Sequence, residues 1–124
     1  MQEQEIQVKV STRYLEPQSA PAEEKFVFAY TITIENHSTD TVQLLNRTWH
    51  ITDANGKETQ VQGDGVVGEQ PRIPPGESYT YTSGTVLNTP LGNMSGAYGM
   101  VWESGQHWQL PVPTFRLAVP NILH

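Results

Sequence analysis

The stretch 25–36 constrains the fold more than any other part of the sequence. Apolar residues alternate there with a period of two, placing Phe26, Phe28, Tyr30, Ile32 and Ile34 on one face. This period is that of a β-strand. The opposite face carries no charge until Glu35, which predicts a central strand that is fully covered on one side and only partly wet on the other.

Shorter stretches of the same kind recur along the chain. We expect further strands at 5–9, 41–53, 57–62, from Tyr79 onward, 97–102, 107–112 and 115–119. Alternation slips at Leu44-Leu45-Asn46, which predicts a β-bulge, and Asn55-Gly56 predicts a tight hairpin with positive φ at both residues.

Turn-forming residues separate these predicted strands. Residues 87–96 are expected to form a long loop, Ser83-Gly84 a turn, and Pro111 with Pro113 to place their strand at a sheet edge. Because no window shows helical periodicity, the fold class predicted is all-β, an immunoglobulin/fibronectin type III-like two-sheet β-sandwich. One domain is expected to span residues 1–124.

Composition excludes several kinds of site and partner. The chain has no cysteine, which excludes disulfides, thiolate nucleophiles and cysteine-based metal sites. A net charge of −6 opposes the phosphate neutralisation that nucleic-acid binding requires, so we expect no nucleic-acid partner. No apolar run approaches the length of a membrane span, so no membrane association and a cytoplasmic location are expected.

The segment 63–70 contains the one motif that suggests a ligand. Gly63-Asp64-Gly65-Val66-Val67-Gly68 has the GxGxxG spacing that brings a backbone close to pyrophosphate at the start of a helix. Prolines follow instead of a helix, and the two acids would repel phosphate. We therefore expect a structural loop with residues at positive φ. The alternative is an anion site formed by Gly63, Asp64, Gly65, Gly68 and Glu69.

No catalytic or metal-binding constellation emerges from the remaining residues. A nucleophilic serine with a histidine base and an acidic orienter cannot be assembled from any recognisable motif. The four histidines, His37, His50, His107 and His124, have no spacing typical of a compact metal site. We expect no catalytic residues, no metal ligands and no cofactor.

Several stretches together resemble the ApaG family, also called CorD. They are Arg47 to Asp53, Gly63 to Pro71, Pro75-Gly76-Glu77 with Tyr81 to Gly84, Thr89 to Gly96 with Tyr98, and Phe115 to Pro120. The resemblance implies a fibronectin-like sandwich and a genetic link to cobalt and magnesium tolerance. Related domains in eukaryotic F-box proteins and in a DNA polymerase-interacting protein imply that the domain docks partners.

Two functions from different classes follow. The first is a non-catalytic domain that binds another protein, which predicts a contiguous exposed apolar or aromatic patch. The alternative is a small-ligand sensor that binds a divalent cation or polyphosphate at the loop from Gly63 to Gly68, which predicts donors or carboxylates that converge there.

Overall fold

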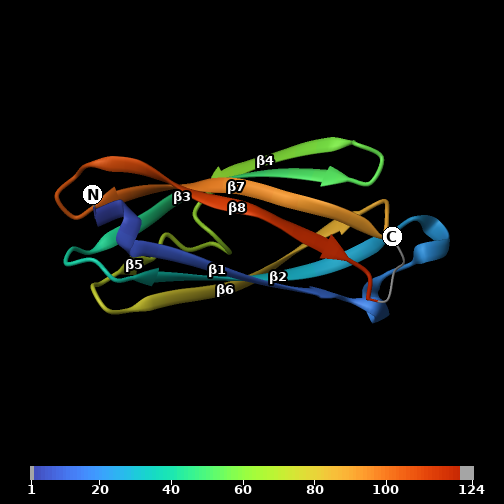
Figure 1. The fold of residues 1–124 in the computed structure, drawn as a ribbon, viewed down its shortest axis with the longest axis horizontal. Coiled ribbons are helices and arrows are strands. Elements are labelled where there is room, and N and C mark those ends of the chain that lie inside the picture. The colour runs from blue at the N-terminus through green and yellow to red at the C-terminus, as the bar shows by residue number, and fades with distance from the viewer. Residues whose placement is uncertain (1, 121–124) are drawn as a thin grey trace.

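A computed structural model of the chain describes residues 2–120. Two antiparallel sheets lie one above the other, and no α-helix occurs among the described residues (Figure 1). The strands are β1 (Ile6–Tyr14), β2 (Phe26–Asn36), β3 (Val42–Asp53), β4 (Glu58–Asp64), β5 (Arg72–Ile73), β6 (Ser78–Leu87), β7 (Leu91–Trp102) and β8 (His107–Ala118). Short 3₁₀ turns cover Gln2–Glu5 (η1), Glu16–Gln18 (η2) and Pro21–Glu23 (η3). This architecture confirms the predicted immunoglobulin/fibronectin-like sandwich.

The smaller sheet has the order β1-β2-β6, with β2 at its centre. Phe28, Tyr30, Ile32 and Ile34 are buried on its inner face, as the alternation of this stretch predicts. Hydroxyl groups line the outer face, where Thr31 and Thr82 share a hydrogen bond of 2.8 Å across β2 and β6. The two outer strands, β1 and β6, are the edges of this sheet.

The larger sheet has the order β4-β3-β7-β8, with the short β5 paired to β3. The predicted bulge is present, because the register of β3 against β7 shifts between Leu44 and Asn46. The hairpin from β3 to β4 is also present, but only Gly56 of the Asn55-Gly56 pair has a positive φ, of 83°. A three-residue loop closed by the bond from the Asp53 amide to the Lys57 carbonyl (3.0 Å) requires one such residue.

The long loop expected at 87–96 is not there. Strand β7 begins at Leu91 and runs unbroken to Trp102, and Ser83-Gly84, expected to turn, lies within β6. The glycines mark tight packing: a Cβ on Gly96 would collide with the Thr48 carbonyl, and one on Gly99 with the Asn46 side chain. Small residues inside a strand can serve close approach as well as turning.

Strand β8 is one continuous strand where two were expected, at 107–112 and 115–119. It pairs only with β7, so Pro111 and Pro113 lie on an edge strand, as predicted. An edge strand tolerates proline because one side of its backbone has no strand to bond.

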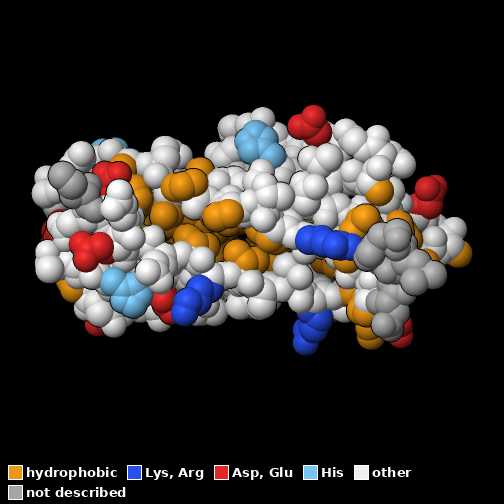
Figure 2. Space-filling model, viewed as in Figure 1, with side chains coloured by type: hydrophobic (Ala, Val, Ile, Leu, Met, Phe, Trp, Pro, Cys, Tyr) orange, Lys and Arg blue, Asp and Glu red, His pale blue; other side chains and the backbone are white. Residues whose placement is uncertain are grey.

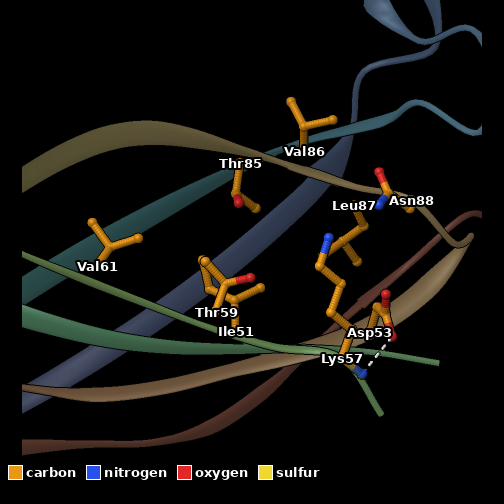
Figure 3. A pocket seen from close by; sticks show the side chains of 9 residues that line it. All are labelled: Ile51, Asp53, Lys57, Thr59, Val61, Thr85, Val86, Leu87 and Asn88. Atoms are coloured by element: carbon orange, nitrogen blue, oxygen red, sulfur yellow. Dashed lines mark hydrogen bonds between the residues drawn. The ribbon is translucent and has the colours of Figure 1, made fainter. Parts of the chain in front are cut away.

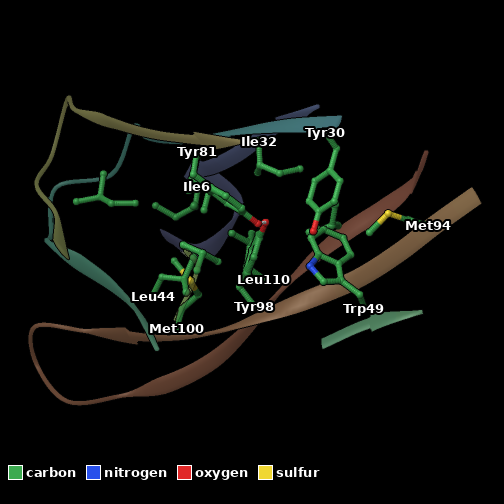
Figure 4. Close-up of a cluster of buried hydrophobic side chains, with 14 of the residues drawn as sticks. Ile6, Tyr30, Ile32, Leu44, Trp49, Tyr81, Met94, Tyr98, Met100 and Leu110 are labelled. Carbon is green, nitrogen blue, oxygen red and sulfur yellow. Dashed lines mark hydrogen bonds between the residues drawn. The ribbon is translucent and has the colours of Figure 1, made fainter. Parts of the chain in front are cut away.

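Aromatic rings from both sheets meet in the core (Figure 4). Trp49, 2% exposed, makes edge-on ring contacts with Tyr30, Tyr98 and Phe115 at centroid distances of 5.6, 5.8 and 5.8 Å. Such edge-to-face contacts add to the free energy gained from burying the rings. None of the described residues forms a helix that could cross a membrane.

Candidate functional site

The glycine loop, residues 63–70, is held by an arginine from the neighbouring strand. Arg47 Nη1 on β3 donates to the backbone carbonyls of Asp64 (3.2 Å) and Gly65 (2.9 Å). Its guanidinium lies over Gly63, whose missing Cβ would stand 2.7 Å from Nη1. Arg47 and Gly63 are register partners in the hairpin. The first glycine of the motif is therefore needed for this close approach to Arg47.

Backbone hydrogen bonds, within the loop and to β3, use several of the amides that an anion would need. The Gly65 amide donates to the Leu45 carbonyl (2.7 Å), while Val66 and Glu69 exchange amide-to-carbonyl bonds of 2.8 and 2.9 Å. Gly65, Val67 and Gly68 have positive φ values of 63°, 49° and 78°. The expected positive φ is thus found, and no helix follows, because the next element is β5.

The five residues of the alternative anion site lie partly on β4 and partly in the turn that follows it. Gly63 and Asp64 end β4, Gly65 is buried against the Glu69 backbone, and Gly68 and Glu69 are exposed. Arg72, the only cation near the motif in sequence, is 2.9 Å from Glu103. The cation that contacts the loop is Arg47. Arg47 has no role among the sequence-based expectations, although extending the predicted hairpin by one residue places Arg47 opposite Gly63.

The histidines occupy separate surface positions. His37 contacts Glu35 at 3.1 Å, while His50 and His107 are exposed on β3 and β8. His124 lies outside the described residues. Across residues 2–120, no group of three or more acidic or histidine side chains could hold a metal ion. Hydrogen bonds from His37 and Lys9 lower the pKa of the Glu35 carboxyl, which is an ordinary surface interaction.

Two tyrosine hydroxyls meet in the interior. The hydroxyls of Tyr81 on β6 and Tyr98 on β7 lie 2.5 Å apart and link the two sheets (Figure 4). Burial raises the pKa of both phenols above the ordinary value of 10. A neutral phenol of this kind is a poor base at neutral pH, so the pair can crosslink the sheets but cannot readily abstract a proton.

An apolar groove runs between the edge strands β1 and β8. Hydrophobic side chains gather in this furrow across the middle of the molecule (Figure 2). Its volume is about 590 Å³, and its walls include Ile6 and Val8 on one side and Trp108, Leu110 and Pro111 on the other. We call it the β1–β8 groove. Ile6 and Leu110 form its buried floor, Val8 and Trp108 are half-buried, and Pro111 is exposed.

A smaller hollow of about 220 Å³ lies on the opposite side of the sandwich, between the β3–β4 hairpin and β6 (Figure 3). Val61 and Val86 are 36% and 52% exposed there. The Lys57 side chain extends from the hairpin toward Leu87 and Asn88. We call this the β4–β6 hollow.

Known proteins resemble the chain over nearly its whole length. The family model described as ApaG domain matches residues 16–102. A Shewanella protein named ApaG is 57% identical over 119 residues, which cover 96% of this chain and 94% of that protein.

Solved structures of similar proteins have the same fold. An X-ray structure of a structural-genomics target shares 55% identity, covers 100% of this chain and 94% of that one, and superposes with a TM-score of 0.94. A crystal structure of a Bordetella pertussis protein named ApaA shares 43% identity, covers 94% and 95% of the two chains, and gives a TM-score of 0.92.

Proposed function

The chain belongs to the ApaG family, and from that premise we propose that residues 1–124 form one domain that binds another protein and catalyses no reaction itself. The observation that carries this proposal is the β1–β8 groove. An exposed apolar furrow rimmed by polar residues is typical of an interaction site. A tryptophan and prolines in its wall are rigid apolar surfaces, which suit the anchoring of a partner's side chains.

Charge indicates the chemistry of the partner segment. Glu3 lines the groove and makes no ion pair with any residue among 2–120, whereas Lys9, the other charged residue of the wall, is 3.2 Å from Glu35. The chain as a whole carries a net charge of −6. The partner segment that fits is therefore apolar at its centre and flanked by lysine or arginine.

The cobalt and magnesium tolerance linked to ApaG proteins is explained, in this proposal, by the activity of the bound partner. The ion-sensor alternative has weaker support, because the Val66 and Glu69 amides are bonded within the loop and the Gly65 amide is bonded to Leu45 on β3. The acids Asp64 and Glu69 are also exposed, where water competes for any cation they could hold.

Capture from the source cells followed by a variant comparison tests the proposal. Proteins retained by the wild-type chain are identified by mass spectrometry, purified, and titrated calorimetrically against the wild type, Val8→Lys and Ser11→Lys. Val8 faces the groove and Ser11 is exposed elsewhere on β1, so the two variants add the same charge to one strand.

We expect Val8→Lys to raise the partner's Kd at least tenfold and Ser11→Lys to leave it almost unchanged. Melting curves check that both variants fold. If no protein is retained reproducibly, the interaction function is wrong. If Val8→Lys and Ser11→Lys bind alike, the groove is not the binding site.

A further inference from the structure

Strand β6 is an edge strand that lacks the features with which proteins usually block edge pairing. Natural edges carry charged residues, prolines or bulges. Lys9 and Arg13 lie on β1, Glu58 and Asp64 on β4, and two prolines on β8, whereas the ten residues of β6 include no charge and no proline. Its pairing with β2 also has no register shift.

The direction of the free backbone groups follows from one hydrogen bond. The Asn36 amide donates to the Glu77 carbonyl (2.9 Å), and bonded pairs alternate along an antiparallel ladder. Odd-numbered residues of β6 therefore bond β2, and even-numbered ones turn their N–H and C=O groups to the open edge. The residues with free backbone groups are all exposed: Ser78, Thr80, Thr82, Gly84 and Val86.

We propose that β6 pairs antiparallel with β6 of a second copy of this chain, about a two-fold axis through Thr82. The two three-stranded sheets then form one continuous sheet. Thr82 is the middle of the five outward-facing residues, so only an axis at this position pairs all of them: Thr82 with its equivalent, Thr80 with Gly84, and Ser78 with Val86. Such a symmetric contact is self-complementary.

The same register brings two unpaired charges together. Glu77 of the second copy lies opposite Leu87, which lines the β4–β6 hollow beside Lys57 (Figure 3). Neither Glu77 nor Lys57 makes an ion pair with any residue that the structure describes. The symmetry forms this Glu77–Lys57 pair twice, and no like charges face each other along β6.

The register also covers apolar surface. Tyr79 of the second copy lies opposite Thr85, whose side chain lines the β4–β6 hollow together with Val61 and Val86. Tyr79 is half-buried in the single chain. Association would therefore bury more of a tyrosine ring and the exposed Val61, which is the apolar part of the contact.

Sedimentation equilibrium over a wide range of protein concentration tests the proposal. The wild type is expected to self-associate to a dimer. Thr82→Asp places two carboxylates against each other on the axis and is expected to raise the dimer Kd about tenfold or more. Ser11→Asp, the same charge change on the exposed β1 edge of the same sheet, is the matched control and should leave the Kd unchanged.

The charge pair gives a second test that does not disturb β6. Lys57→Glu and Glu77→Lys should each weaken the dimer, and the double variant should recover it. A wild type that stays monomeric at the highest concentration overturns the proposal, even if an extended peptide of another protein binds β6. A dimer that is indifferent to Thr82→Asp, or weakened equally by Ser11→Asp, also overturns it.

Discussion

At the scale of single residues, Arg47 and the glycines explain why the GxGxxG spacing occurs in a chain without a phosphate-binding helix. Gly63 leaves room for the guanidinium, and Gly65 and Gly68 adopt positive φ. Arg47 then bonds two loop carbonyls and ties the loop to β3. Packing at Gly63 and positive φ at Gly65 and Gly68 give each of the three glycines a structural role.

Gly65→Ala and Gly68→Ala form a matched pair that tests this explanation. Both place a Cβ at positive φ, which costs about 1–2 kcal/mol. At Gly68 nothing lies within 4 Å of the new Cβ, whereas at Gly65 it collides with the Glu69 carbonyl. Urea unfolding should therefore show a larger loss for Gly65→Ala, by at least about 1 kcal/mol. Equal losses would contradict the packing role of Gly65.

The buried Tyr81–Tyr98 pair predicts a loss of stability in alkali. The raised pKa of both phenols means that the unfolded chain releases their protons near pH 10 while the folded chain retains them. Their contribution is fully present below pH 10 and falls as pH rises above it. Urea unfolding between neutral pH and pH above 10 should show this fall, and the double variant Tyr81→Phe with Tyr98→Phe should show a smaller one. An equal fall in both proteins would contradict the burial of the pair.

At the scale of elements, the sequence predicted best where side-chain alternation is unbroken. Strand β2 follows from the alternation between Phe26 and Ile34, and the bulge in β3 from the slip at Leu44 to Asn46. The edge position of β8 follows from its two prolines. The second half of β7, residues 97–102, was predicted, but its first half was predicted as a loop. Gly92 and Gly96 serve close approach there, which depends on neighbours distant in sequence and cannot be distinguished locally from turning.

The same limit applies to the candidate site. The positive φ values of the glycine loop could be predicted from glycine itself, but its contact with Arg47 required the hairpin register. The β1–β8 groove depends on which edges of the two sheets meet. Strands β1 and β8 lie at opposite ends of the sequence, so local patterns carry no information about their contact.

Gly96→Ala tests the close approach of β7 to β3. Its Cβ would collide with the Thr48 carbonyl and stand 2.9 Å from the Trp49 ring, so we expect a loss of about 1–3 kcal/mol in the free energy of unfolding. Gly84→Ala in β6 is the control, because its nearest neighbour, the Phe28 carbonyl, is 3.2 Å away; its change should stay below about 1 kcal/mol. Equal effects would contradict the account of β7.

At the scale of the whole molecule, the sandwich presents different surfaces on its two open sides. The β1–β8 groove is apolar and protected from strand pairing by prolines, whereas β6 leaves a regular row of backbone groups free. The β1–β8 groove suits a partner's side chains, and the open edge of β6 suits another strand. Binding to a second copy and binding to another protein can therefore occur on one molecule without competition.

A nitrogen–proton correlation spectrum titrated separately with pyrophosphate, ATP, magnesium and cobalt at physiological salt tests most directly whether recognition lies outside the glycine loop. The amides of Gly63, Gly65, Val66 and Gly68 report on the loop. We predict no saturable shifts at these amides, because the Gly65 and Val66 amides already donate to the Leu45 and Glu69 carbonyls and no helix N-terminus follows the loop. Saturable shifts confined to them would contradict this prediction and make the loop a ligand site.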